Sequence, residues 1–189
     1  MGWGRSRWAV SWSVLAPAAA LVAPAPVFAV DYLTVDQAQR LLFPDADAFQ
    51  HRELTLDAGQ RRQLGDRLGT APRASWQIGL ALHQGQPLGL VVVDDVIGKF
   101  ERITYATALG TDGTVRGLEI LSYRESHGFE VRLPAWRKQF LGKTAASPLR
   151  VGEDIANISG ATLSCHHVTE GVRRVVAVVD ALGRAGALR

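Results

Sequence analysis

Two pairs of alternating apolar segments between residues 76 and 123 restrict the fold most strongly. The first pair covers residues 76–82 and 88–93, joined by the turn sequence Gln84-Gly85-Gln86-Pro87. The second covers residues 103–109 and 115–123, joined by Gly110-Thr111-Asp112-Gly113. Alternation with a period of two is typical of strands that bury one face, and Asp-Gly between two such segments is a strong hairpin signal. The sequence therefore predicts two antiparallel hairpins.

Helical patterns lie on both sides of these strands. Thr34 followed by Gln37 is a capping-box pattern, which predicts a short helix that ends before Pro44. A second helix is predicted over residues 56–68, ending at Gly69. Residues 45–54, with His51 among them, are predicted to form a loop. The expected fold is α+β: one domain with a largely antiparallel sheet and packed helices, preceded by a helical segment over residues 30–72.

The first 29 residues have the pattern of a secretory signal peptide. Arg5 and Arg7 form a positive start, residues 8–22 carry no charge, and the segment ends in the small-residue cleavage pattern Val27-Phe28-Ala29. Cleavage after Ala29 would release an exported protein. The alternative is an uncleaved anchor, because the uncharged stretch from Trp8 to Val30 is long enough to span a bilayer.

Charge and cysteine content exclude some classes of protein. Removal of Arg5 and Arg7 with the leader reduces the 21 basic residues to 19, against 18 acidic ones. No basic stripe with interleaved aromatic residues is present, so we expect no nucleic-acid partner. Cys165 is the only cysteine, which leaves an exported chain without an internal disulfide. Contiguous Cys165-His166-His167 point in different directions on a helix, so no metal site is expected.

The sequence after residue 157 combines small and hydroxyl residues with a strongly periodic helix. The helical face carries valines, namely Val168, Val172, Val175, Val176 and Val179. A helix that begins near Ser164 would direct its unpaired N–H groups toward Thr162 and form a site for a phosphate. Gly160 allows close approach of a ligand to the backbone. The alternative is an ordinary cap, because Ser and Thr are common just before helices.

The motif Ser159-Gly160-Ala161-Thr162-x-Ser164 resembles the flavinylation motif of the FMN-binding domain family. This family includes flavinylated subunits of the sodium-pumping NADH:quinone reductase and of the Rnf complex, together with periplasmic relatives. The resemblance implies a periplasmic FMN-binding domain over residues 73–189, with FMN attached to Thr162 through a phosphoester. Residues 95–99 also match periplasmic members, and residues 123–128 are similar to the family's Glu-Thr-Pro-Gly segment. A further match is the Trp-x-x-Gln-Phe-x-Gly-Lys run of Trp136, Gln139, Phe140, Gly142 and Lys143.

The resemblance also implies the roles of the remaining site residues. Ser159, Gly160, Ala161 and Ser164 would shape the phosphate and ribityl end of the site. Glu125, Ser126 and Gly128 would line the isoalloxazine side, although Glu125 could instead be a solvated loop carboxylate. One position departs from the family pattern. The Asp that usually lies six residues before the acceptor is Ala156 here, and Asp154 lies two residues earlier.

The function implied is electron transfer by bound FMN, without a catalytic acid, base or nucleophile of the chain. The implied partners are a flavin transferase, a membrane-bound electron donor and a periplasmic acceptor. Two alternatives remain open because of Ala156: a module that binds FMN without a covalent bond, and a ligand-free interaction domain of a membrane redox complex.

Overall fold

The computed structural model describes Met1 and residues 30–184. Apart from Met1, the predicted signal peptide of residues 1–29 lies outside the described residues, and so do residues 185–189.

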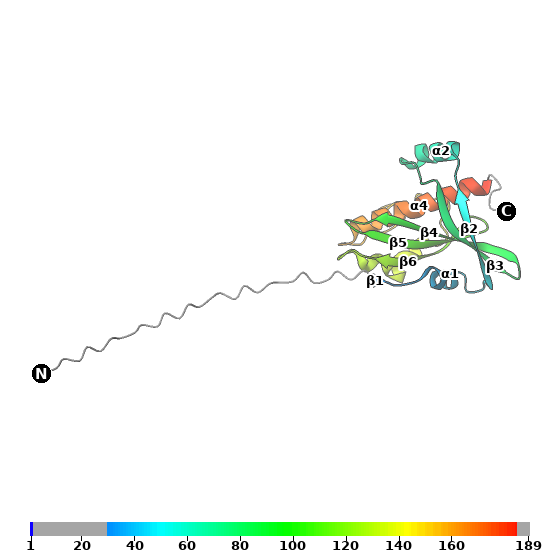
Figure 1. The fold of residues 1–189 in the computed structure, drawn as a ribbon. Helices are drawn as coiled ribbons and strands as arrows, with labels where there is room; N and C mark the ends of the chain where they lie inside the picture. Colours follow the sequence, from blue (N-terminus) through cyan, green and yellow to red (C-terminus); the bar gives the residue numbers. More distant parts are fainter. Residues whose placement is uncertain (2–29, 185–189) are drawn as a thin grey trace.

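An antiparallel sheet of six strands forms the centre of the molecule (Figure 1). The predicted hairpins are confirmed: β3 (Ser75–His83) pairs with β4 (Gln86–Ile97), and β5 (Arg102–Gly110) pairs with β6 (Val115–Tyr123). The α+β fold class is confirmed as well. The strand order is β1-β6-β5-β4-β3-β2, so each hairpin is extended by one further strand at its outer edge.

These two edge strands were not predicted. The prediction of a loop over residues 45–54 is wrong, because Ala48–Thr55 form β2, which pairs with β3 over its whole length. Leu54 is the one buried residue of β2, so this edge strand lacks the alternating apolar pattern. Backbone hydrogen bonds to β3 define it instead. The other edge strand, β1, consists of Val30–Asp31 and pairs with the end of β6.

Two of the helices begin where their capping residues direct. In α1 (Val35–Leu42), Thr34 and Gln37 form the predicted capping box, with N···O distances of 3.2 and 2.9 Å. In α2 (Ala58–Leu68), Asp57 and Gln60 form a second capping box, so the helix starts two residues after the predicted position. Three short helical segments were not predicted: η1 (Phe129–Arg132), α3 (Pro134–Arg137) and η2 (Lys138–Phe140).

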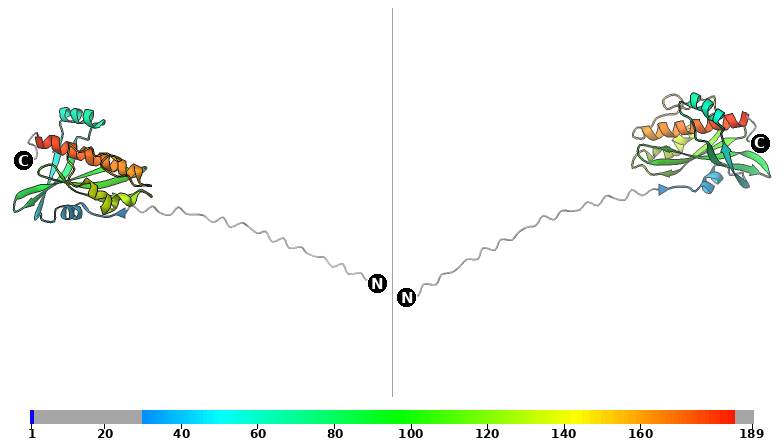
Figure 2. Two further views of the ribbon diagram at one scale, coloured as in Figure 1. Left: turned by 180° about the vertical axis from the view of Figure 1, so that it is seen from behind. Right: turned by 45° about the horizontal axis from the view of Figure 1, so that its top comes forward.

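Helices cover both faces of the sheet (Figures 1 and 2). The long helix α4 (Thr162–Arg184) packs on one face and α1 on the other. Alternate residues of β4 show how the sheet serves both layers: Leu90 belongs to the core cluster beneath α4, and Val91 to the cluster beneath α1. This arrangement fixes the position of α4, whose first turn carries the predicted acceptor Thr162.

Close contact between α4 and the sheet depends on Gly171. A Cβ atom added there would overlap the Tyr105 hydroxyl and lie 2.8 Å from Tyr105 Cζ and 3.0 Å from Val96 Cγ1. We expect Gly171→Ala to lower the free energy of unfolding by about 1–3 kcal/mol, because overpacking displaces the helix. Urea unfolding measures this loss. The matched control is Gly183→Ala near the exposed end of the same helix, which we expect to leave stability unchanged or raise it by less than about 1 kcal/mol.

Candidate functional site

The predicted acceptor lies in the first turn of α4. The helix starts at Thr162, two residues before the predicted start near Ser164. The N–H of Cys165 donates to the carbonyl of Ala161 at 2.9 Å, which makes Ala161 the N-cap. Gly160 has a φ of +86° and completes the turn in which the N–H of Ala161 donates to the Ile158 carbonyl at 3.0 Å. Thr162 is therefore the first helical residue and not the cap.

The Thr162 side chain is exposed, and its Oγ1 accepts a hydrogen bond from Asn157 Nδ2 at 3.1 Å. A Cβ atom added at the neighbouring Gly160 would meet nothing within 4 Å. Space around the Thr162 hydroxyl and the adjacent backbone is therefore open to a bulky ligand. The Thr162 hydroxyl is thus accessible to a flavin donor, as an acceptor residue must be.

Among the described residues, no side chain caps the start of α4 in the way that Thr34 caps α1 and Asp57 caps α2. The N-cap of α4 is Ala161, which offers no side-chain oxygen, whereas α1 and α2 carry full capping boxes. The first N–H groups of a helix have no partner within the helix, and they lie at the positive end of its dipole. A phosphate on Thr162 fits this site, because its oxygens can accept hydrogen bonds from these N–H groups.

The second predicted segment, which contains Gly128, lies directly against the first. A Cβ atom added at Gly128 would lie 3.3 Å from Ala161 Cα and 3.0 Å from Ser164 Oγ. Tyr123 links the two segments: its hydroxyl donates to the His127 carbonyl at 2.5 Å and lies 2.8 Å from Ser164 Oγ. Since the phenol has a single proton, Ser164 donates to Tyr123. Burial raises the pKa of Tyr123, which keeps this proton in place.

Glu125 and Ser126 make local contacts at the same end of the sheet. Glu125 Oε1 accepts the N–H groups of Phe100 and Glu101 at 2.6 and 2.9 Å, and thereby holds the turn between β4 and β5. His167 of α4 holds the same turn through Nδ1, which lies 3.1 Å from the Gly98 carbonyl oxygen. Ser126 Oγ contacts His127 Nδ1 at 2.9 Å. The role of Glu125 and Ser126 beside the isoalloxazine ring stays a prediction.

The Trp-x-x-Gln run forms a clamp on Ala156. Trp136 Nε1 donates to the Ala156 carbonyl at 2.8 Å, and the Ala156 N–H donates to Gln139 Oε1 at 2.7 Å. Both hydrogen bonds use the backbone of residue 156, so they do not require an Asp side chain there. Asp154 does not replace that side chain, because it pairs with Lys143 at 2.8 Å and caps Leu149 and Arg150.

The Lys143–Asp154 pair makes stability depend on pH. Partial burial alone would raise the pKa of Asp154, but Lys143 and the N–H groups of Arg150 and Leu149 outweigh it and hold this pKa below its usual value. The pair therefore stabilises the folded state above the ordinary aspartate pKa of about 4, and this contribution is lost as the pH falls through the lowered pKa. We expect Asp154→Asn to lower stability at pH 7, with a difference that shrinks below pH 4. Urea unfolding between pH 3 and 7 measures it, and a difference independent of pH would contradict this assignment.

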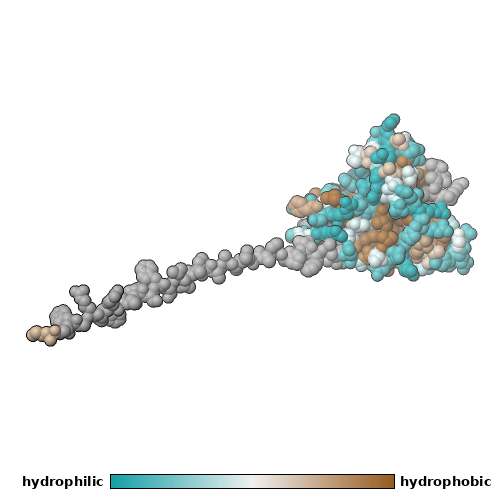
Figure 3. All heavy atoms as spheres, viewed as in Figure 1, coloured by the Kyte–Doolittle hydropathy of each residue, from teal (hydrophilic) through white to brown (hydrophobic). Residues whose placement is uncertain are grey.

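Exposed apolar side chains surround the start of α4. Ile97 and Phe100 flank the turn between β4 and β5, Phe129 follows Gly128, and Leu163 follows Thr162; Phe100 is 73% exposed and Leu163 45%. This face of the molecule is mostly hydrophilic, and one of its hydrophobic patches lies at the end where α4 begins (Figure 3). At this end of the sheet, the exposed Thr162 hydroxyl therefore lies beside an apolar rim formed by Ile97, Phe100, Phe129 and Leu163.

The three residues Cys165, His166 and His167 diverge, as their contiguous positions predict. Cys165 is buried, and burial raises the pKa of its thiol. His166 is exposed, and His167 contacts Gly98. Among residues 30–184, no group of three or more His, Cys, Asp or Glu side chains could hold a metal ion.

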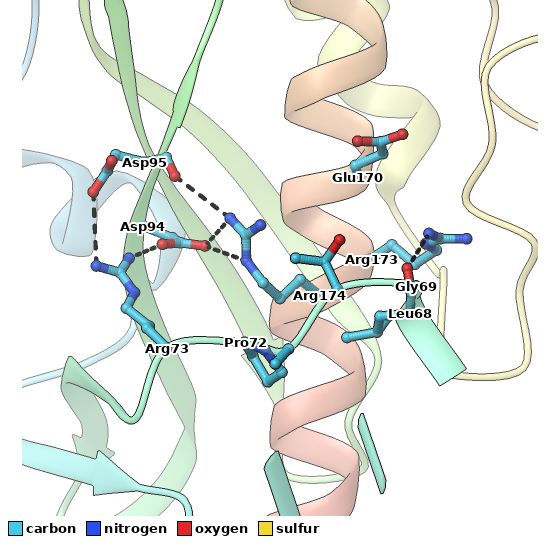
Figure 4. A pocket seen from close by; sticks show the side chains of 11 residues that line it. Leu68, Gly69, Pro72, Arg73, Asp94, Asp95, Glu170, Arg173 and Arg174 are labelled. Atoms are coloured by element: carbon cyan, nitrogen blue, oxygen red, sulfur yellow. Dashed lines mark hydrogen bonds and ion pairs between the residues drawn. The ribbon is translucent and has the colours of Figure 1, made fainter. Parts of the chain in front are cut away.

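A hollow of about 450 Å³ lies elsewhere, between α4 and the chain after α2 (Figure 4). None of the predicted site residues lines it. Its wall contains the buried Asp94, which pairs with Arg73 and with Arg174 at 2.9 Å and accepts the Tyr105 hydroxyl at 3.0 Å. Burial raises the pKa of Tyr105, so the phenol remains a donor. These ion pairs join β4 to α4, and we assign them to stability.

Residues 98–177 match the sequence model of a family described as the FMN-binding domain. The predicted resemblance is confirmed. The matched range contains the turn after β4, residues 123–128, the clamp and the start of α4, and FMN is the cofactor that it indicates, as predicted. No curated protein matches the chain significantly.

Two bacterial proteins are among the solved structures that share the fold. NqrC of Shewanella oneidensis is 16% identical with a TM-score of 0.59, and the similarity covers 82% of this chain and 98% of NqrC. The corresponding subunit of the Na⁺-translocating NADH-quinone reductase of Parabacteroides distasonis is 14% identical with a TM-score of 0.50, covering 71% and 77% of the two chains. At these identities the likeness concerns the fold. No helix within residues 30–184 is long and apolar enough to cross a membrane.

Proposed function

We propose that this protein is an exported electron-transfer flavoprotein that carries FMN covalently on Thr162 through a phosphoester. The observation that carries the proposal is the exposed Thr162 hydroxyl in the first turn of a helix whose N-cap is alanine. The match to the FMN-binding domain family supports FMN as the group attached there.

The chain would hold the phosphate end of FMN with backbone groups. The first N–H groups of α4 favour an anion, and the open backbone at Gly160 leaves room for it. Tyr123 and Ser164 fix the loop of Gly128 against this site. When bound, FMN supplies the redox chemistry, whereas the protein sets its position and solvent exposure. The apolar rim around Leu163 and Phe100 suits the ring or the surface of a redox partner.

The location and the partners are part of the proposal. The leader pattern of residues 1–29 supports export to the periplasm. A covalent bond suits an exported carrier, since a dissociated flavin would be diluted outside the cytoplasm. The fold is shared with a component of an NADH-quinone reductase, which supports a membrane-bound electron donor, a periplasmic acceptor and a place in a membrane redox complex. A flavin transferase would attach FMN.

Ala156 favours one alternative, a reversible FMN site, because the usual Asp is absent. The intact mass of denatured protein, produced with a flavin transferase and exported, separates the two. We expect the mass to exceed that of the unmodified chain by FMN less one water, and this gain to be absent in Thr162→Ala. We also expect the mass to correspond to a chain that begins at Val30, after cleavage at Ala29. An unmodified mass would contradict covalent attachment: yellow native protein would then indicate reversible binding, and colourless protein a ligand-free domain.

A further inference from the structure

We infer that Asn157 is a positioning residue for the modification of Thr162, an inference that rests on the proposed function. Its side-chain Nδ2 donates to Thr162 Oγ1 at 3.1 Å, and both residues are exposed. Among the residues that the structure describes, this is the one side chain hydrogen-bonded to the acceptor oxygen. The amide holds the Thr162 hydroxyl in the orientation from which it attacks the flavin donor.

The hydrogen bond selects the rotamer of Thr162. A helical Thr divides between χ1 rotamers, because its Oγ1 can turn back to bond a carbonyl of the preceding turn. The carbonyl of Ile158, four residues earlier, already accepts the N–H of Ala161. Donation from Asn157 occupies one lone pair of Oγ1 and leaves the hydroxyl proton and the other lone pair free. The oxygen is then available to a donor that approaches from solvent.

The backbone next to Asn157 is fixed by a clamp from another part of the chain. Trp136, which is 3% exposed, and Gln139 bind the carbonyl and the N–H of Ala156 at 2.8 and 2.7 Å. Asn157 follows directly, so its side chain starts from an anchored position. The clamp thus connects the core with the acceptor hydroxyl through Ala156 and Asn157. The structural role of the Trp-x-x-Gln run is to hold this loop in position.

The amide orients the hydroxyl but cannot take its proton, because a carboxamide is neutral at all relevant pH values. In the modification step, Thr162 Oγ attacks the phosphorus of the FMN half of a dinucleotide in which FMN is joined to a nucleotide by a diphosphate. A new O–P bond forms, the bridging P–O bond breaks, and a nucleoside monophosphate leaves. The hydroxyl proton passes to a base of the transferase. The chain's own contribution is orientation, which acts on the rate of the step.

Kinetics of flavin transfer test this role. Purified unmodified protein is titrated against a flavin transferase with flavin adenine dinucleotide. We expect Asn157→Ala to lower kcat about tenfold while KM changes less than about twofold, because the loose hydroxyl spends less time in the reactive orientation. Asn157→Gln, which retains the amide donor, should restore part of kcat. The control Glu153→Ala lies in the same loop with an exposed side chain paired to Arg150, and should behave as wild type.

Asparagine-specific labelling provides a readout besides turnover. Asn157 is the only asparagine in the chain, so asparagine labelled with ¹⁵N in its side chain yields one ¹⁵N signal, which the two amide protons share. Thr162→Val should shift this signal, whereas Thr162→Ser and Glu153→Ala should leave it near its wild-type position.

A kcat for Asn157→Ala equal to that of the wild type would overturn the inference. An Asn157 amide signal that does not shift in Thr162→Val would overturn it as well. Wild-type protein that accepts no flavin would overturn the proposed function instead, and the spectrum would still test the hydrogen bond.

Discussion

Replacement of Asp94 by alanine is expected to lower the free energy of unfolding by about 3 kcal/mol. Asp94 is 2% exposed and lies between Arg73, Arg174 and the hydroxyl of Tyr105. Removing one partner of a buried ion pair leaves the others without compensation, which costs about 3–5 kcal/mol. The lower end applies here, because the side chains of Arg73 and Arg174 are 43% and 29% exposed and can turn toward solvent. Urea unfolding at pH 7 measures the loss.

The adjacent Asp95 provides a matched control. Its side chain is 28% exposed and pairs with Arg102 at 2.6 Å and with Arg73 at 3.7 Å. Because pairs near the surface contribute about 0–1 kcal/mol, Asp95→Ala should have a small effect. Equal losses of unfolding free energy in the two variants would show that the ion pairs of Asp94 do not stabilise the packing of β4 against α4.

The second large effect is expected at Gly128. With a φ of +86°, this residue has a conformation that β-branched residues avoid, and an added Cβ would lie 2.6 Å from the Tyr123 hydroxyl. Gly128→Val should therefore push the loop of residues 123–128 away from Ala161 and Ser164. We expect flavin incorporation to fall at least about tenfold, since displacements of about 1 Å have larger effects on well-positioned reactions. Flavin per protein after denaturing chromatography measures it.

Gly142→Val is the control that separates the effect of loop displacement from the effect of backbone strain. It has a similar φ of +76°, but an added Cβ would meet nothing within 4 Å. Gly142→Val should lose stability through strain alone and still accept flavin. Loss of flavin in both variants to the same degree would indicate that general destabilisation, and not the contact with Ala161 and Ser164, explains the result at Gly128.

Local patterns made much of this fold predictable. Both hairpins follow from alternating apolar residues and turn sequences, and the start of α1 follows from Thr34 and Gln37, whose signals all lie within a few residues. The edge strand β2 was missed because its pairing with β3, and not its own burial, defines it. The start of α4 was misplaced because its N-cap is Ala161, a residue without a capping side chain.

The site was predictable in its parts but not in its connections. Family motifs identified Thr162, Gly128 and the Trp-x-x-Gln run separately. Contacts between them depend on tertiary structure: Tyr123 meets Ser164 across 41 residues, and Trp136 reaches Ala156 across 20. No local pattern marked Asn157, since an isolated asparagine in a loop is ordinary turn chemistry. The motifs therefore indicated which residues matter, and the fold indicated what they contact.

The position of the flavin is the most direct test of covalent attachment at Thr162. Trypsin cleaves after Arg150 and Arg173, and the resulting peptide of residues 151–173 contains Thr162 together with three competing hydroxyl residues, Ser159, Ser164 and Thr169. Fragmentation of this peptide from exported protein, produced with a flavin transferase, locates the modification. We expect FMN less one water on Thr162. An unmodified peptide, or flavin on one of the other three residues, would contradict it.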